Sequence, residues 1–284
     1  MLQEYTIFGV EDKVKNSIDA LRSFEPTEGY FVAFSGGKDS VVVKALCDMA
    51  GVKYDAHYNV TSVDPPELVK FIKEFYPDVK RDIPHDADGN PITMWNLIPK
   101  KSMPPTRVVR YCCAELKEIS GKGRICVTGV RWAESVRRKN KHGLVSIWGG
   151  TILNNDNDES REVLESCYRH KKTLLNPIIN WEDDDVWEFI KTNKIPYCKL
   201  YDDGYTRLGC IGCPMNTAAA ADLEKYPKYK QAYLRAFERM LEERQKKGLK
   251  TVWETANEVM EWWLTGKVEK PIDGQMEMDF DVIG

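Results

Sequence analysis

The chain has 284 residues, of which 42% are hydrophobic and 30% charged, and its formal net charge is −3 at pH 7. This length allows one large domain, or one domain with an appendage, to bury a substantial core. Balanced charge provides no overall positive field for nucleic acid or an acidic membrane, and no apolar run is long enough to span a membrane. The N-terminus lacks a cationic segment followed by an apolar one, so we expect a cytoplasmic protein. In that compartment the eight cysteines are expected to be thiols or metal ligands rather than disulfides.

An amphipathic helix is predicted over residues 10–24, where apolar residues recur at helical spacing. The apolar run 31–34 favours a strand, and a second apolar run from residue 41 favours a helix. Two glycines between these runs permit a tight turn. We therefore expect a strand, a turn and a helix N-terminus in direct succession.

The turn has the sequence Ser-Gly-Gly-Lys-Asp-Ser, which predicts a phosphate site. Backbone amides and the positive end of the helix dipole face the same point, Lys38 adds a cation, and Asp39 is a candidate ligand for Mg²⁺. The spacing differs from Walker A and from the dinucleotide fingerprint. It resembles the pyrophosphate loop (PP-loop) of the adenine nucleotide α-hydrolase superfamily, and a structural glycine turn is the alternative. The residues expected to bind nucleotide are Ser35, Gly36, Gly37, Lys38, Asp39 and Ser40.

A second strand is predicted over residues 53–59 and a helix over 65–75, ending before Pro77. Strand–helix–strand–helix order is typical of a parallel sheet. Thr61 and Asp64 follow the second strand at the end where open α/β sheets bind ligands, so they are candidates to contact an adenosine. A capped turn before the helix explains the same residues equally well.

The middle of the chain is less periodic. Residues 81–105 are rich in proline and polar residues and are predicted to form a long loop or lid near the site, with one or two helical turns over Met94–Ile98. A helix is predicted over 111–117, a short strand over 124–129, and a mobile acidic loop over 154–162. Acidic residues after Trp181 fit the first turn of a further helix.

Three residues after the strand at 124–129 are expected to bind the nucleotide: Gly129, Arg131 and Arg138. They too follow the carboxyl end of a strand. A guanidinium binds phosphate or sulfate through two parallel hydrogen bonds, which a lysine cannot imitate. A solvated charged face is the alternative for the run 137–139, and it suits Lys139 better than Arg131.

Two helices are predicted near the C-terminus, over residues 226–247 and 252–264, and they form a helical appendage. The last stretch has prolines, a glycine and alternating acids and is expected to be disordered. The predicted organisation is therefore a nucleotide-binding domain over residues 1–215, the helical appendage over 216–266 and a disordered tail over 267–284.

Four of the eight cysteines form two pairs, Cys112-Cys113 and Cys210-x-x-Cys213. A Cys-x-x-Cys spacing lets two sulfurs converge on one metal. Adjacent cysteines point in opposite directions on a strand, so the first pair must lie on a helix or bend to bind jointly. Structural zinc sites typically use two spaced pairs, whereas a [4Fe–4S] cluster accepts neighbouring ligands. The pattern therefore favours an iron–sulfur cluster, with zinc as the alternative.

Together these landmarks resemble the phosphoadenosine phosphosulfate (PAPS) and adenosine phosphosulfate (APS) reductase family, over about residues 30–215. The segment Leu200–Cys213 is especially specific, because matching residues also precede it. The resemblance implies an α/β fold with a Rossmann-like parallel sheet of the adenine nucleotide α-hydrolase type. It also implies that the four paired cysteines correspond to the ligands of a [4Fe–4S] cluster, namely Cys112, Cys113, Cys210 and Cys213.

One departure from this family concerns its nucleophile. The reductases carry a reactive cysteine in a C-terminal Glu-Cys-Gly-Leu-His-like motif, whereas residues 214–284 contain no cysteine, and Cys167 is only a speculative substitute. Related proteins with a PP-loop and a cysteine-bound cluster instead cleave ATP to AMP and pyrophosphate and replace an activated oxygen with sulfur. Bacterial DNA phosphorothioation enzymes and some tRNA thiolases are of this kind, and their chemistry fits this chain better.

The leading hypothesis is therefore an enzyme of ATP-dependent sulfur transfer, in which Lys38, Asp39 and Arg131 are the predicted catalytic residues. ATP, Mg²⁺ and the cluster are the expected cofactors and substrates. Two alternatives remain open: a genuine PAPS or APS reductase that releases sulfite, and a non-catalytic nucleotide-binding subunit of a larger complex. The partners considered are a nucleic-acid sulfur acceptor, a cysteine desulfurase or thioredoxin-type donor, and a second copy of the chain, but no membrane.

Overall fold

The computed structural model describes residues 2–6, 9–118, 120–147, 151–154, 157–158, 160 and 171–266. The chain forms two compact units. The first comprises Met1–Asn59, Pro66–Asp82 and Ile119–Leu208, and the second comprises Val60–Pro65, Ile83–Glu118 and the chain from Gly209 onward. The predicted tail 267–284 and Cys167 lie outside the described residues. Among the described helices, none combines the length and the apolar character that a membrane crossing requires.

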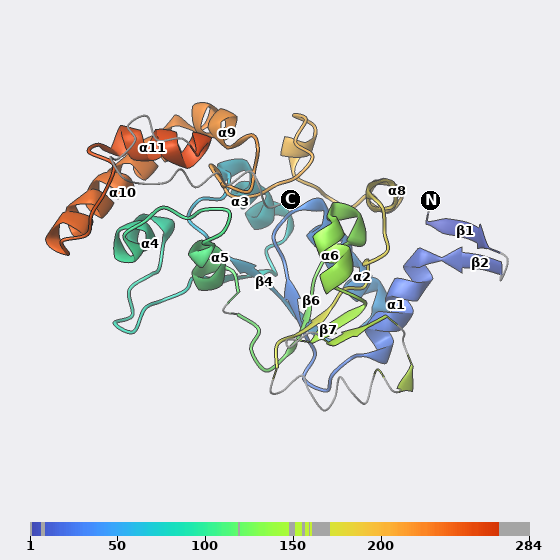
Figure 1. Ribbon diagram of the computed structural model, residues 1–284. Coiled ribbons are helices and arrows are strands. Elements are labelled where there is room, and N and C mark those ends of the chain that lie inside the picture. Colours follow the sequence, from blue (N-terminus) through green and yellow to red (C-terminus); the bar gives the residue numbers. More distant parts are fainter. Residues whose placement is uncertain are drawn as a thin grey trace. The chain divides into compact units, whose positions relative to one another are not determined.

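The first unit is built on a seven-stranded sheet with the strand order β5-β4-β3-β6-β9-β7-β8 (Figure 1). The first five strands in this order are parallel, whereas β7 runs antiparallel to both β9 and β8. The predicted α/β class with a Rossmann-like sheet is confirmed, and the antiparallel edge makes the sheet mixed. The strands are β3 (Tyr30–Ala33), β4 (Tyr54–Asn59), β5 (Lys80–Asp82), β6 (Ile125–Val127), β7 (Val145–Ile147), β8 (Thr151–Leu153) and β9 (Thr173–Leu175).

Strand β3 is central to this unit because it pairs with β4 on one side and with β6 on the other. The chain therefore leaves β3 toward one edge of the sheet and returns at β6 to build the other half. Ligands of open α/β sheets bind outside the carboxyl ends of the strands at such a switch point. The predicted PP-loop follows β3, and Gly129 follows β6, so both lie at the expected ligand-binding edge.

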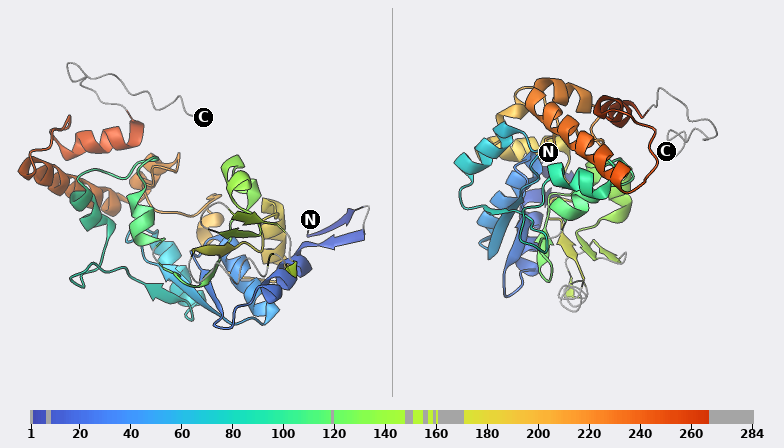
Figure 2. Two further views of the ribbon diagram at one scale, coloured as in Figure 1. Left: turned by 60° about the horizontal axis from the view of Figure 1, so that its bottom comes forward. Right: turned by 90° about the vertical axis from the view of Figure 1, so that its left-hand side faces the viewer.

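The helices of the first unit match most of the predicted periodic segments. They are α1 (Lys13–Ser23), α2 (Lys38–Ala50), α3 (Pro66–Phe75), α6 (Val136–Lys141) and α8 (Asp183–Thr192), with short 3₁₀ turns η1 (Trp132–Glu134) and η2 (Lys199–Tyr201). One boundary differs, because the helix predicted from residue 10 begins at Lys13. Asp12 accepts a hydrogen bond from the amide of Lys15 and caps the helix there. Residue 10 lies instead in a two-stranded hairpin of β1 (Gln3–Thr6) and β2 (Gly9–Asp12), drawn at the N-terminus in Figure 2.

The second unit is helical in its described part. Its helices are α4 (Met94–Lys101), α5 (Tyr111–Leu116), α9 (Ala219–Lys225), α10 (Pro227–Lys246) and α11 (Ala256–Thr265). Helix α10 packs against α4, α9 and α11, and their shared core includes Ile98, Phe237 and Met240, each fully buried (Figure 2). The helical turns predicted over Met94–Ile98 within the loop 81–105 form α4, which extends to Lys101 and begins at a reciprocal capping box of Thr93 and Asn96. The boundary predicted between residues 215 and 216 remains a prediction.

A buried ion pair in the first unit links α1 to α8. The Nζ atom of Lys13 lies 2.7 Å from Oδ2 of Asp185, and the two side chains are 7% and 0% exposed. We expect Lys13→Met to lower the free energy of unfolding by about 3–5 kcal/mol, because it removes the buried ammonium that pairs with the Asp185 carboxylate. Chemical denaturation at neutral pH measures this loss. Lys15→Met is the control, because Lys15 belongs to the same helix but is exposed.

The same pair predicts a pH dependence. Burial acts to raise the pKa of Asp185, but hydrogen bonds, among them those from Lys13 and from the amide of Glu182, outweigh it together with the charge of Lys13, so this pKa is lowered in the folded protein. The stability that the pair contributes is therefore present above the unfolded-state pKa of about 4 and is lost as the pH falls through the lower folded value. Lys13→Met should flatten the acid limb of the stability curve. An unchanged acid limb would contradict this assignment.

Candidate functional site

The loop between β3 and α2 has the geometry expected of an anion site. Gly36 has a φ of +73°, and a β-carbon there would lie 2.7 Å from Cδ1 of Leu68 and 2.8 Å from the Ile72 side chain. Gly37 is the N-cap residue of α2 and has extended backbone angles. As a glycine it provides no side-chain hydrogen bond to the first turn of the helix. Gly36 is thus favoured by its positive φ and by close packing, whereas the backbone of Gly37 is open to other residues. Together they leave the helix N-terminus facing the turn.

Hydroxyl groups surround this turn. Ser40 donates a hydrogen bond to the carbonyl of Gly37 at 2.8 Å, and Ser35 lies 3.3 Å from the Ser40 hydroxyl. The amide of Lys38, at the first residue of α2, donates to the hydroxyl of Tyr201 at 2.8 Å. Burial raises the pKa of Tyr201 above its ordinary value, so this group stays a neutral hydroxyl. Tyr201 was not among the predicted site residues.

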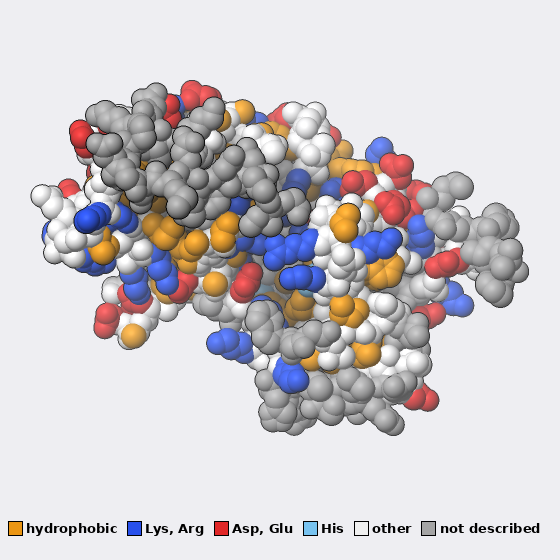
Figure 3. Space-filling model, viewed as in Figure 1, with side chains coloured by type: hydrophobic (Ala, Val, Ile, Leu, Met, Phe, Trp, Pro, Cys, Tyr) orange, Lys and Arg blue, Asp and Glu red, His pale blue; other side chains and the backbone are white. Residues whose placement is uncertain are grey.

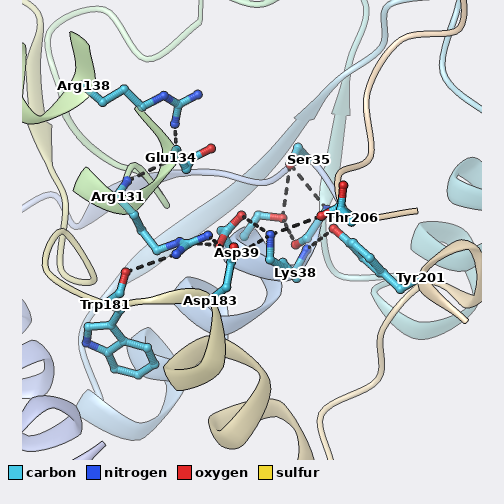
Figure 4. A network of polar contacts seen from close by, with 12 residues as sticks. Ser35, Lys38, Asp39, Arg131, Glu134, Arg138, Trp181, Asp183, Tyr201 and Thr206 are labelled. Atoms are coloured by element: carbon cyan, nitrogen blue, oxygen red, sulfur yellow. Dashed lines mark hydrogen bonds and ion pairs between the residues drawn. The ribbon is translucent and has the colours of Figure 1, made fainter. Parts of the chain in front are cut away.

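The ammonium of Lys38 is held above the loop by oxygen atoms (Figure 4). Its Nζ atom lies 3.2 Å from Oδ1 of Asp183, 3.4 Å from the carbonyl of Thr206 and 3.7 Å from Oδ2 of Asp39. Asp183 is the first residue of α8, and its side chain is 67% exposed. The sequence predicts this acid only in the first turn of a helix. Its position beyond the carboxyl end of β9 was the available signal for a site residue.

Arg131 lies beneath the loop and is 1% exposed. Its Nε atom donates to Oδ1 of Asp39 at 2.7 Å, and its Nη2 atom donates to Oδ1 of Asp183 at 2.7 Å. The remaining nitrogen, Nη1, donates to the carbonyl of Trp181 at 3.1 Å. The predicted catalytic residue Arg131 therefore joins the two carboxylates of the site, and its donors point to protein oxygens in this state (Figure 4).

The charges of this cluster shift the pKa of Asp183. Partial burial acts to raise that pKa, but the hydrogen bond from Arg131 and the charge of Lys38 outweigh the burial and lower it. Asp183 is therefore ionised at neutral pH and offsets part of the positive charge at the loop. The structure thus places an internal anion beside the predicted phosphate site.

Gly129 follows β6 and packs directly against the start of α2. A β-carbon on Gly129 would lie 2.9 Å from Cβ of Asp39 and 3.0 Å from its carbonyl carbon. These atoms belong to the chain that carries the loop, and backbone cannot move aside as a flexible side chain can. Gly129 therefore contributes to the site by allowing close approach rather than by offering a ligand atom.

Arg138 projects from α6, where positively charged side chains gather in Figure 3. It pairs with Glu134, which also accepts the amide of Arg131. Burial lowers the pKa of Arg138, and the nearby charges of Arg207 and Arg131 act in the same direction. The charges of Glu134 and Asp39 oppose this lowering.

The predicted metal ligands all lie in the second unit. Cys112 and Cys113 occupy the first turn of α5, so the adjacent pair is on a helix as its joint binding requires. Hydrogen bonds from Cys112 and from Arg110, which lies 3.2 Å from the Cys113 sulfur, lower the pKa of Cys113 to about 5. The pKa of Cys112 is raised by its hydrogen bond to Cys113, by burial, and by the charges of Cys210 and Cys213. The charges of the second cysteine pair thus add to the rise in the pKa of Cys112.

Thr61 and Asp64, predicted to contact adenosine, belong to this second unit and are 1% and 7% exposed. The Cys210 sulfur lies 3.8 Å from Oγ1 of Thr61 and 3.9 Å from Oδ1 of Asp64. The charge of Cys210 raises the pKa of Lys117, with Asp64 adding to this effect. The structure therefore places Thr61 and Asp64 beside a cysteine, and their contact with a nucleotide remains a prediction.

No group of three or more His, Cys, Asp or Glu side chains in the described ranges is arranged to hold a single metal ion. This finding does not favour zinc at the four cysteines. A four-iron cube carries its cysteines at separate corners rather than on one central ion. The iron–sulfur cluster remains a prediction.

The other described cysteines are unsuited to nucleophilic chemistry. Cys47, Cys126 and Cys198 are 0%, 3% and 1% exposed. Burial raises the pKa of Cys47 to about 12 and also raises the pKa of the other two. Thiols of this kind are protonated and inaccessible at neutral pH.

Comparison with known proteins identifies the family. Residues 29–216 match the family described as the phosphoadenosine phosphosulfate reductase domain. The chain belongs to this family. The match spans more than half of the chain and includes the loop, Gly129, Arg131 and both cysteine pairs. The resemblance inferred from the sequence is therefore confirmed.

Relatives of this PAPS reductase family chain include enzymes named for sulfonucleotide reduction. Adenosine 5′-phosphosulfate reductase of Staphylococcus haemolyticus is 24% identical over 75% of this chain and 82% of its own length. The corresponding enzyme of Oceanobacillus iheyensis is 44% identical, but over only 19% of this chain and 22% of its own length. An uncharacterized protein of Methanocaldococcus jannaschii is 26% identical over 69% of this chain and 44% of its own length. The chain thus matches less than half the length of two of these relatives.

Two solved structures match the chain at low identity. The phosphate complex of PAPS reductase from Candida auris is 15% identical, with a TM-score of 0.44 over 69% of this chain and 88% of that one. The NH₃-dependent NAD synthetase from Campylobacter jejuni is also 15% identical, with a TM-score of 0.40 over 85% of this chain and 98% of that one.

Proposed function

We propose that this PAPS reductase family chain is an ATP pyrophosphatase that activates an acceptor oxygen and supports its replacement by sulfur. The observation that carries the proposal is the loop at residues 35–40, where the start of α2, the Lys38 ammonium and the Asp39 carboxylate converge. This arrangement suits the phosphates of a nucleotide, with Asp39 as a candidate Mg²⁺ ligand.

The chain's own residues would bind and orient the nucleotide. Amides of the loop and the hydroxyls of Ser35 and Ser40 would hold the phosphates, and Lys38 would offset the charge on the pyrophosphate leaving group. An acceptor oxygen would attack the α-phosphorus, and the bond from that phosphorus to the bridging oxygen of pyrophosphate would break. Arg131 would act through Asp39 and Asp183, which it orients, since its donors already contact protein oxygens.

The cysteine pairs fit an iron–sulfur cluster by the chemistry of their donor set. The four thiols lie in one unit, the described cysteines form no disulfide, and Arg110 and Lys117 provide positive charge beside them. Cys112, Cys113, Cys210 and Cys213 would be the ligands. Bound there, a cluster would supply a site that holds inorganic sulfide for the sulfur-replacement step.

A genuine APS or PAPS reductase is the second candidate, favoured by the names of relatives such as the Staphylococcus haemolyticus enzyme. Its chemistry needs a thiol that attacks the sulfate sulfur. The described cysteines outside the two pairs are buried with raised pKa values, and residues 214–284 contain no cysteine. These observations favour ATP as the substrate, although Cys167 lies outside the described residues.

Separate incubations with ATP, APS and PAPS distinguish the candidates. Protein purified without oxygen would be supplied with Mg²⁺, thioredoxin, a cysteine desulfurase with cysteine, and a mixture of DNA and tRNA as acceptors. We expect pyrophosphate from ATP and no sulfite from either sulfonucleotide. Sulfite release would support the reductase instead, and nucleotide binding without any product would indicate a non-catalytic subunit.

A further inference from the structure

The donors of the loop are occupied by the protein's own oxygens. The Lys38 amide donates to the Tyr201 hydroxyl at 2.8 Å, and the Lys38 ammonium lies 3.2 Å from the Asp183 carboxylate. Both acceptors stand where the phosphate oxygens of a bound nucleotide would be expected. Both come from the segment that follows β9, so one stretch of chain provides the acceptors for the amide and the ammonium of Lys38 (Figure 4).

These two acceptors are fixed in place by their surroundings. Arg131, which is 1% exposed, donates to the same Asp183 oxygen that contacts Lys38. The Tyr201 ring packs edge-on against Trp187, with ring centroids 5.1 Å apart. A β-carbon on Gly37 would lie 3.5 Å from the Tyr201 hydroxyl, so this oxygen is in contact distance of the turn. The contacts are therefore built into the first unit rather than made by a loose side chain.

We propose that Asp183 and Tyr201 act as internal substitutes for phosphate, which hold Lys38 in position before a nucleotide binds and which an incoming phosphate group must displace. The inference rests on the proposed binding of a nucleotide to this loop. The negative carboxylate of Asp183 beside Lys38 opposes the binding of any further anion. The Tyr201 hydroxyl accepts the hydrogen bond of the Lys38 amide, so this donor is already occupied. Affinity is thereby lowered, while the lysine is kept oriented for the reaction.

Equilibrium binding of inorganic pyrophosphate, measured by calorimetry, tests this inference without an acceptor. Asp183→Asn and Tyr201→Phe should each bind pyrophosphate about three- to tenfold more tightly than their controls, the range expected for partly exposed charge and hydrogen-bond contacts. Without ligand, both variants should unfold at a lower temperature than the wild type, because the internal contacts are lost. A purely structural role would lower stability without improving affinity.

The chain provides a matched control for each variant. Asp184→Asn removes the same charge from the same helical turn, and the Asp184 carboxylate has no partner among the described residues. Tyr197→Phe removes a hydroxyl from another ring that packs on Trp187, but that hydroxyl contacts Asp202 rather than the loop. These controls remove the general effects of net charge and of ring packing.

In the turnover assay with ATP, Asp183→Asn should lower both KM and kcat, because tighter binding comes with a less oriented lysine. Pyrophosphate affinity that is equal to or weaker than the control in either variant would overturn the inference while leaving the proposed function in place. No pyrophosphate binding by the wild type or any variant would overturn both.

Discussion

Replacing Cys213 with alanine should reduce the iron content of anaerobically purified protein from about four atoms per chain to less than one. A [4Fe–4S] cluster with four cysteine ligands loses a corner in this variant, and the remaining thiols cannot complete the coordination. Iron and acid-labile sulfide would be measured together, and the brown colour should fade with them. The sulfur-replacement activity should be lost in the same variant.

Cys198→Ala is the matched control for this measurement. Cys198 is 1% exposed and belongs to the first unit, whereas both cysteine pairs belong to the second. Its iron content should equal that of the wild type. Full iron in Cys213→Ala, or zinc in place of iron in the wild type, would contradict the assignment of the four cysteines.

Gly129→Ala should lower kcat/KM for ATP by about a hundredfold, the loss expected when catalytic groups move by about 1 Å. The added carbon would lie 2.9 Å from Cβ of Asp39 and 3.0 Å from its carbonyl carbon. Relief of this overlap must shift Asp39 and the first turn of α2, which carry the predicted metal and phosphate contacts. Binding of ATP, followed by calorimetry, should weaken in parallel.

Gly209→Ala serves as the steric control, because a β-carbon there meets no atom within 4 Å. Its ATP affinity should match that of the wild type. Gly129→Ala with wild-type affinity and turnover would show that the loop is a structural turn and not a nucleotide site. Unfolding curves for both variants would separate a local displacement from a loss of the fold.

The central part of the fold could be predicted because its signals are local. Apolar runs such as 31–34 form parallel strands that are mostly buried, and the glycine turn marks the start of α2. The antiparallel strands β7 and β8 have only three residues each, which is too short for a periodic pattern to be evident. The hairpin at the N-terminus was missed because Val10 also fits the helical spacing, and the Asp12 cap decides the boundary.

The candidate site was only partly predictable for a different reason. The loop and both cysteine pairs are contiguous motifs, so the sequence alone locates them. Asp183 and Tyr201 reach the loop only through the folded sheet. Tyr201 lies in the family landmark Leu200–Cys213, but that resemblance does not indicate a contact with the loop. Arg131 was expected to meet the nucleotide, but its burial against Asp39 and Asp183 depends on contacts across 92 and 52 positions of the chain.

The products of ATP cleavage test the central claim most directly. Phosphorus NMR of a reaction containing the anaerobic protein, ATP, Mg²⁺, a sulfide source and the nucleic-acid acceptors distinguishes which phosphate bond breaks. The account predicts AMP and pyrophosphate, formed in the wild type and lost in Gly129→Ala. ADP and inorganic phosphate, or intact ATP under all conditions, would contradict it.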